Sequence, residues 1–133
     1  MANAVIYWSA TGNTEAMAQA VAEGAGVKAV TFSEFDGDIA ALDAVAFGCP
    51  AMGAEELEDS EVEPFFAANE SKLAGKRVAL FGSYDWGDGE WMRLWAERVK
   101  AAGAELVDEG LICNLTPDDE ALAKCKALGE KIK

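Results

Sequence analysis

The sequence predicts a single α/β domain, in which a doubly wound, five-stranded parallel sheet is covered by helices on both faces. Five short apolar runs alternate with helical patterns, as in a parallel sheet whose strands are buried on both sides. At 133 residues, 51% of them hydrophobic, the chain has the size and apolar content of one ordinary domain. No linker, repeat or low-complexity segment divides residues 1–133.

The predicted strands are apolar runs of strand length. Nearly continuous apolar runs, rather than alternating ones, are typical of strands buried on both faces. A polar Asp-Glu-Gly break at residues 108–110 interrupts the last run. In chain order the strands are Val5–Trp8, Val27–Phe32, Ala44–Phe47, Val78–Phe81 and Glu105–Cys113.

Helical patterns fill most intervals between these strands. The first pattern stops at Gly24 and Gly26. The third carries Trp91 and Trp95, whose four-residue spacing predicts two core positions on one helix face. Residues 33–42 are expected to hold only a short helix. The three clearer patterns run over Asn13–Ala25, Glu61–Leu73 and Asp88–Ala102.

A last helix should begin near residue 116. Thr116 is a favourable N-cap, and Pro117 suits the first helical position because an N–H there would have no partner within the helix. The residues expected to face the core are Leu122, Cys125, Leu128, Gly129 and Ile132.

Charge is the outstanding bulk property of the chain. Its 24 acidic and 11 basic residues give a formal net charge of −13, which argues against nucleic acid or an anionic membrane as a partner. The acidic residues are concentrated, because residues 52–71 contain seven of them and no Lys or Arg. Both simple solubility and docking onto basic proteins are consistent with this pattern.

Missing residue types narrow the function further. The chain has no His, the commonest general base and transition-metal ligand, and we expect neither a metal site nor catalytic residues. Three widely spaced cysteines without a C-x-x-C pair predict a reduced, cytoplasmic protein with buried thiols. No run approaches the ~20 apolar residues of a membrane span, and the first residues do not resemble a signal peptide.

Ligands of such sheets bind beyond the carboxyl ends of the strands, where the strand order reverses. The candidate loops therefore follow the first, third and fourth strands. They read "SATGNT" (loop one, residues 9–14), "CPAMGAEE" (loop two, residues 49–56) and "GSYDWGDGE" (loop three, residues 82–90).

Loop one combines hydroxyl and amide side chains with a glycine that permits close backbone approach. It matches neither the G-x-x-x-x-G-K-[ST] nor the G-x-G-x-x-G pattern, and the first 27 residues contain no Lys or Arg. Neutral donors at a helix N-terminus suit a terminal monophosphate, although a plain helix cap would have the same composition. The residues concerned are Ser9, Thr11, Gly12, Asn13 and Thr14.

Loops two and three offer apolar and aromatic side chains. Met52 could pack on an aromatic ring or simply fill the edge of the sheet. Trp86, between glycines at the end of a strand, is well placed to stack on a flat ligand. The three loops together therefore predict a planar aromatic ligand with a monophosphate tail between Met52 and Trp86, which describes FMN.

Three stretches, "WSATGNTEAMA", "GCPAMGAEELEDSEVEPFF" and "GSYDWGDGEWM", make the chain resemble a short-chain flavodoxin from end to end, closest to those of anaerobes. The resemblance implies the strand order 2-1-3-4-5. It also implies a low-potential one-electron carrier with non-covalently bound FMN, which would shuttle electrons between redox enzymes in place of ferredoxin.

The same resemblance assigns the cofactor site. Loop one would hold the phosphate, Met52 and Trp86 would flank the isoalloxazine, and Glu55 would accept a hydrogen bond from the pyrimidine-ring imide. The peptide between Met52 and Gly53 would flip on reduction. The implied set is Ser9, Ala10, Thr11, Gly12, Asn13, Thr14, Pro50, Ala51, Met52, Gly53, Ala54, Glu55, Ser83, Tyr84, Asp85, Trp86 and Gly87, of which Ala54 and Asp85 depart from the usual family residues.

Partners are expected to be basic redox proteins docking on a monomer, at an acidic rim formed by Glu58, Asp59, Glu61 and Glu63. Two other functions remain open: a flavodoxin-like activator of one metalloenzyme, such as a ribonucleotide reductase, and a small FMN-dependent quinone reductase. A stable neutral semiquinone with a very negative second potential would distinguish the carrier from both.

Overall fold

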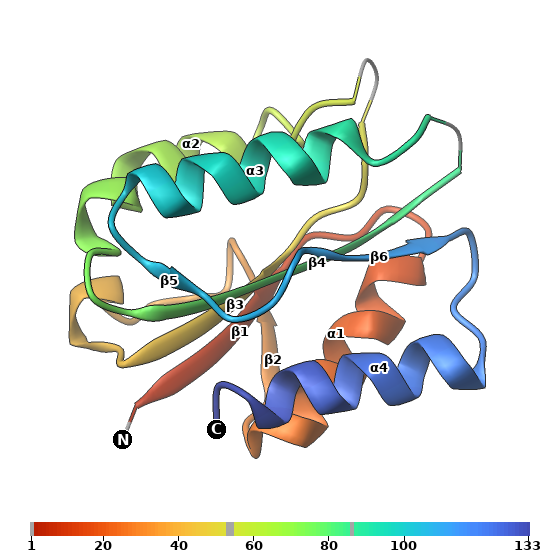
Figure 1. The fold of residues 1–133 in the computed structure, drawn as a ribbon, viewed down its shortest axis with the longest axis horizontal. Coiled ribbons are helices and arrows are strands. Elements are labelled where there is room, and N and C mark those ends of the chain that lie inside the picture. Colours follow the sequence, from red (N-terminus) through yellow and green to blue (C-terminus); the bar gives the residue numbers. More distant parts are fainter. Residues whose placement is uncertain (1, 53–54, 86) are drawn as a thin grey trace.

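The computed structural model describes residues 2–52, 55–85 and 87–133, and it confirms the α/β prediction. Six strands form one sheet, and each pair of neighbours is parallel. The order along the sheet is β2-β1-β3-β4-β5, with β6 also pairing β4 (Figure 1). The strands are β1 Asn3–Tyr7, β2 Ala29–Thr31, β3 Ala44–Gly48, β4 Arg77–Tyr84, β5 Glu105–Leu106 and β6 Leu111–Asn114.

Helices cover both faces of the sheet, as predicted. In Figure 1, α1 and α4 lie on one side, and α2 and α3 lie on the other. The α-helices are α1 Asn13–Ala25, α2 Val62–Asn69, α3 Glu90–Ala101 and α4 Asp119–Glu130. Two short 3₁₀ helices, η1 Ile39–Ala41 and η2 Glu70–Lys72, complete the described elements.

Each layer of helices encloses its own hydrophobic core. The core beneath α1 and α4 consists mainly of small and aliphatic side chains such as Val21 and Leu128, together with Tyr7 and Phe81. The core beneath α2 and α3 is aromatic, and Trp91 and Trp95 are each 1% exposed within it, as their spacing predicted. Both faces of the sheet are therefore dry, which the parallel arrangement requires.

Helices α1 and α4 approach each other closely at two glycines. A Cβ on Gly129 would overlap the carbonyl oxygen of Val21, and a Cβ on Gly24 would overlap that of Lys126. Both obstacles are backbone atoms, which cannot rotate away. The absence of side chains at Gly24 and Gly129 thus sets the distance between the two helices.

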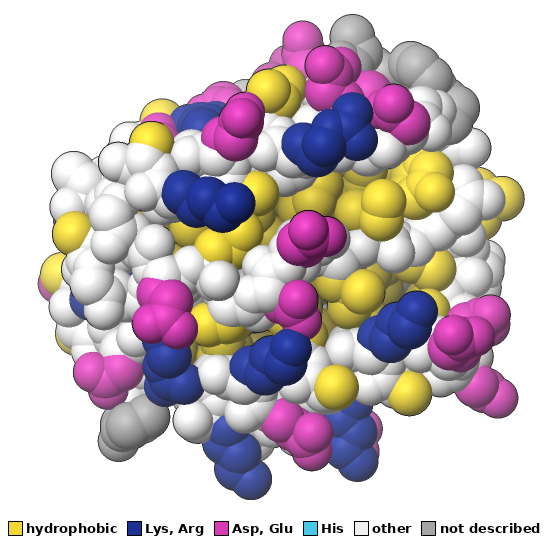
Figure 2. Space-filling view, in the orientation of Figure 1, with side chains coloured by type: hydrophobic (Ala, Val, Ile, Leu, Met, Phe, Trp, Pro, Cys, Tyr) yellow, Lys and Arg dark blue, Asp and Glu magenta, His cyan; other side chains and the backbone are white. Residues whose placement is uncertain are grey.

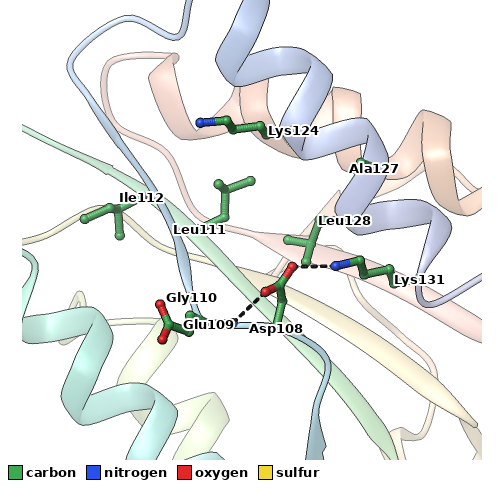
Figure 3. Close-up of a pocket in the computed structure, with 9 residues that line it drawn as sticks. All are labelled: Asp108, Glu109, Gly110, Leu111, Ile112, Lys124, Ala127, Leu128 and Lys131. Carbon is green, nitrogen blue, oxygen red and sulfur yellow. Dashed lines mark hydrogen bonds and ion pairs between the residues drawn. The ribbon is translucent and has the colours of Figure 1, made fainter.

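The predicted fifth strand is two short strands, β5 and β6, which both pair with β4. Asp108 lies in the break with φ 117°, and its carboxylate accepts hydrogen bonds from the Glu109 N–H (3.1 Å) and from Nζ of Lys131 (2.6 Å), as Figure 3 shows. At Gly110 a Cβ would overlap the Met92 side chain. The polar break therefore divides the strand because it anchors to α4 and passes closely beneath α3.

The start of α4 differs from the prediction. Asp118, not Thr116, is the N-cap, because its Oδ1 accepts a hydrogen bond from the Ala121 N–H at 2.8 Å. Pro117 consequently precedes the cap instead of occupying the first helical position. Four of the five residues expected to face the core are buried, and Leu122 is partly exposed.

The remaining differences are small. Helix α3 begins at Glu90 because Gly89 takes a left-handed conformation (φ 92°) at the N-cap. The short helix expected within residues 33–42 is η1, capped by Asp38. No helix in the described part of the chain is long and apolar enough to cross a bilayer.

The three thiols are free and differ in exposure. Cys49 lies in the aromatic core and Cys125 in the core beneath α1 and α4, while Cys113 on β6 is partly exposed. Burial raises the pKa of Cys49 to about 12, and it does the same for Cys125. The prediction of buried thiols holds for these two.

Candidate functional site

The three candidate loops meet at the carboxyl ends of β1, β3, β4 and β6, where they enclose a hollow of about 170 Å³. Except for Leu115, every described residue of its wall belongs to the predicted set. The wall consists of Ser9, Ala10, Thr11, Asn13, Thr14, Pro50, Ala51, Met52, Ser83, Tyr84, Asp85 and Leu115.

Two larger hollows lie along the outer edge of the sheet, one beside α4 and one beside α3. One of about 390 Å³ contains the Asp108–Lys131 ion pair (Figure 3). Another, of about 420 Å³, lies between α3 and the edge strands, where Figure 2 shows a band of hydrophobic side chains interrupted by charged ones. Neither hollow brings together the neutral donors and helix N-terminus that would suit a phosphate.

Some of the predicted residues do not line the hollow. Gly53, Ala54 and Trp86 lie outside the described residues, so the ring sandwich and the peptide flip stay predictions. Gly12 lies at the N-cap of α1. Glu55 and Gly87 are not among the residues that line the hollow, and they lie so close together that a Cβ on Gly87 would overlap the Glu55 carboxylate.

Loop one presents an uncapped helix N-terminus to the hollow. Gly12 has a left-handed backbone (φ 94°) and donates its N–H to Oγ of Ser9 at 3.1 Å, and within the described residues no side chain caps α1. The first N–H groups of a helix carry a partial positive charge and favour anions. The described wall contains no Lys or Arg. Any anion here would therefore be held by neutral donors alone.

Thr14 connects loop one with strand β4. Its Oγ1 lies 2.9 Å from Oγ of Ser83 and accepts the Ser83 N–H at 3.3 Å, and both residues are at least 95% buried. The hydroxyl of Thr14 is therefore engaged within the protein. Its predicted contact with a phosphate is untested, but its structural role is to hold the N-terminus of α1 against β4.

Loop two is closed by its own backbone. Met52 and Glu56 exchange two backbone hydrogen bonds, of 3.0 and 2.9 Å, and the Ala51 N–H donates to the Ser83 carbonyl at 3.0 Å. These bonds fix Met52 at the wall of the hollow. The described part of loop two thus places Met52 at the wall of the hollow, and its packing against a flavin ring stays a prediction.

Glu55 is bound to the N-terminus of α3. Its two carboxylate oxygens accept hydrogen bonds from the backbone N–H groups of Asp88 (3.1 Å) and Trp91 (3.0 Å). A carboxylate is stabilised there by the helix dipole. Glu55 therefore ties loop two to loop three, and its predicted contact with a flavin imide stays a prediction.

Loop three places Tyr84 at the wall, where its ring packs at 50° against Trp91 with 5.9 Å between centroids. Its carbonyl accepts the Leu115 N–H at 2.7 Å and the Asn114 amide at 3.2 Å. Leu115 was not among the predicted residues. Its position directly after the last strand, at the same edge of the sheet, is the signal that could have identified it.

The acidic rim is corrected at Glu58, which is only 5% exposed. Its carboxylate accepts hydrogen bonds from the N–H groups of Ser60 (2.9 Å), Glu61 (2.7 Å) and Val62 (3.1 Å), and from the Ser60 hydroxyl. It therefore closes the turn that begins α2 and cannot contact a partner. Burial alone would raise the pKa of Glu58, but these hydrogen bonds together hold it below its ordinary value.

The carboxylates of the other rim residues differ in whether they are bound within the protein or exposed to a partner. Both oxygens of Glu63 bind Arg98, at 2.7 and 2.9 Å. Glu61 accepts the indole N–H of Trp8 at 3.2 Å. Asp59 is exposed, and so is Glu56 in loop two. The exposed negative charge of the rim and of loop two is therefore carried mainly by Asp59 and Glu56, and Asp85 of loop three, which lines the hollow, is exposed as well.

The sequence is similar to those of known proteins over nearly its whole length. The model of the flavodoxin family matches residues 5–129. A flavodoxin from Megasphaera elsdenii is 49% identical over 132 residues, covering 95% of this chain and 94% of its own. A flavodoxin from Clostridium beijerinckii is 46% identical over 134 residues, covering 96% of each chain.

Solved structures agree in fold over nearly the whole chain. The solution structure of two-electron reduced Megasphaera elsdenii flavodoxin has a TM-score of 0.81 at 44% identity, covering 98% of this chain and 96% of its own. A flavodoxin from the domain Archaea has a TM-score of 0.88 at 29% identity, covering 99% and 96%. The chain therefore belongs to the flavodoxin family.

Proposed function

We propose that this flavodoxin holds FMN in the hollow described above and carries single electrons at low potential between redox enzymes. As a flavodoxin, the protein is a small FMN-binding electron carrier. The two alternatives, a dedicated activator of a metalloenzyme and a quinone reductase, are not favoured, because the flavodoxin relatives match over nearly their full length. When bound, FMN supplies the chemistry of accepting and releasing one electron at a time.

One observation carries the assignment of the site: an uncapped helix N-terminus opens onto a hollow whose described wall has neutral donors but no cation. Loop one can surround a phosphate with hydroxyl, amide and backbone N–H donors. The opposite walls are mainly apolar or aromatic, including Met52, Tyr84 and Leu115. The polar end of the hollow suits the phosphate of FMN, and the apolar remainder suits its ring system.

The phosphate assignment predicts that loop one distinguishes FMN from riboflavin. Thr11→Ala or Asn13→Ala should weaken FMN binding about tenfold, the cost of losing one hydrogen bond to a charged group, and should leave riboflavin binding unchanged. The measurement is a titration of the flavin-free protein with each flavin, followed by quenching of flavin fluorescence. Ser71→Ala, an exposed hydroxyl in η2, is the control. Equal affinities of the unaltered protein for both flavins would refute the assignment.

We also propose that basic redox proteins dock beside loop two, on Asp59 and Glu56. Replacing both with Lys should slow electron transfer to a basic partner several-fold at low ionic strength, because opposite charges raise the rate of encounter. The difference should shrink as salt screens the charges. Glu105→Lys with Glu130→Lys makes the same change in net charge among exposed residues at the other end of the sheet. Equal slowing by both pairs would show that only net charge matters.

The cellular setting is proposed on the same basis. Free thiols, two of them buried, support a reduced cytoplasmic location. A net charge of −13 opposes self-association and supports a monomer.

A further inference from the structure

Leu115 combines two unfavourable properties at one residue. It is 50% exposed, as is Leu94 on α3, although both are large hydrophobic residues. Its backbone is left-handed (φ 59°), a conformation that residues with a Cβ disfavour. Of the exposed large hydrophobic residues in the described chain, only Leu115 lines the hollow.

The strained conformation is imposed by the end of the sheet. Asn114 pairs with Tyr84 in the register of β6 and β4, and its amide donates to the Tyr84 carbonyl at 3.2 Å. The Leu115 N–H donates to the same carbonyl at 2.7 Å. These bonds turn the chain at Leu115 and hold it at the wall formed by loop three. The exposed leucine therefore has a fixed position beside the hollow.

We infer that Leu115 binds the cofactor: its side chain packs on the part of FMN other than the phosphate and excludes water from that wall of the site. An apolar side chain gains free energy only by covering apolar surface, and it offers a phosphate nothing. The phosphate donors belong to loop one, whereas Leu115 is hydrogen-bonded to the Tyr84 carbonyl of loop three. This inference rests on the proposed position of FMN in the hollow.

The inference predicts that replacing Leu115 with a residue that tolerates a left-handed backbone affects the stability of the fold and the binding of flavin differently. Leu115→Gly and Leu115→Asn both suit a left-handed backbone, so the flavin-free protein should unfold at the same or a higher temperature than the unaltered protein. Both variants should bind flavin about tenfold more weakly, which corresponds to covering roughly half of a leucine side chain. Leu94→Asn, an equally exposed leucine outside the hollow, should change flavin binding by less than about twofold.

Comparing FMN with riboflavin separates direct contact from an indirect effect. If Leu115 contacts the part of the cofactor that both flavins share, losing its side chain should weaken the binding of FMN and of riboflavin by the same factor. Unchanged affinity for both flavins would overturn the inference, and so would a loss confined to FMN, which would mean that Leu115 acts through loop one. A lower unfolding temperature in both variants would also overturn it, because the loss of binding would then follow from damage to the fold.

The two proposals fail in distinguishable ways. If Thr11→Ala weakens FMN alone while the Leu115 variants bind normally, the phosphate site stands and the inference about Leu115 is wrong. If the Leu115 variants weaken both flavins equally while Thr11→Ala has no effect, the contact stands and the phosphate assignment is wrong.

Discussion

Gly129→Ala is expected to lower the free energy of unfolding by about 3 kcal/mol, near the upper end of what overpacking a core costs. The added methyl would overlap the Val21 carbonyl oxygen where α4 crosses α1, so one helix must move. The higher helix propensity of alanine returns at most about 1 kcal/mol. Urea unfolding of the full chain, followed by far-ultraviolet circular dichroism, measures the change.

The partner glycine gives the matched test. Gly24→Ala creates the same kind of overlap at the same crossing, with the Lys126 carbonyl oxygen. Once one methyl has moved the helices apart, the second finds more room, so the double variant should lose less stability than the two single variants added together. Gly37→Ala meets only the flexible Phe35 ring and should cost less than about 1 kcal/mol. Strict additivity, or a loss no larger than that of Gly37→Ala, would contradict close contact of α1 and α4.

Glu58→Gln is expected to cost about 2 kcal/mol at pH 7, because an amide cannot accept all the N–H groups that the buried carboxylate accepts at the start of α2. The cost should depend on pH. The pKa of Glu58 is held below its ordinary value in the folded protein, so its contribution is complete above the pKa of the unfolded chain, 4.5. It is then lost as the pH falls through the lower folded value.

The measurement is the urea midpoint of both proteins at pH 7, 5, 4 and 3. The gap between them should remain constant from pH 7 to about 5 and narrow at lower pH. Asp59→Asn, an exposed neighbour, controls for the loss of one charge and should leave the midpoint nearly unchanged. A gap of the same size at pH 3 would mean that the hydrogen bonds at Glu58 do not depend on its charge.

Local signals in the sequence were enough to predict most of the fold. The bounds of α1 were predicted correctly because an N-terminal glycine loop and a C-terminal glycine mark both ends. The start of α4 was predicted wrongly because Thr116 and Asp118 are both favourable caps, and only the folded geometry selects one. The Asp-Glu-Gly break was identified from the sequence. Whether it bends or divides the strand depends on contacts with Lys131, which follows α4, and with Met92 of α3, and local sequence does not reveal these contacts.

The candidate site was predictable to the extent that residue type determines chemistry. The neutral donors of loop one imply an anion held without cations, and the structure places Thr11 and Asn13 at the hollow. Glu58 was misassigned because sequence shows how many charges a segment carries but not which are buried. Leu115 was missed because nothing about a leucine in sequence reveals a left-handed backbone or an exposed side chain.

The distribution of the thiols gives each side of the sheet its own chemical reporter. With pKa values of about 12, Cys49 and Cys125 hold almost no thiolate at neutral pH, and neither can meet an alkylating reagent until the layer above it opens. Because the two cysteines belong to different cores, the rate at which each is labelled follows a different opening event. Mass spectrometry of partially labelled protein would therefore reveal whether the two helical layers open together or one before the other.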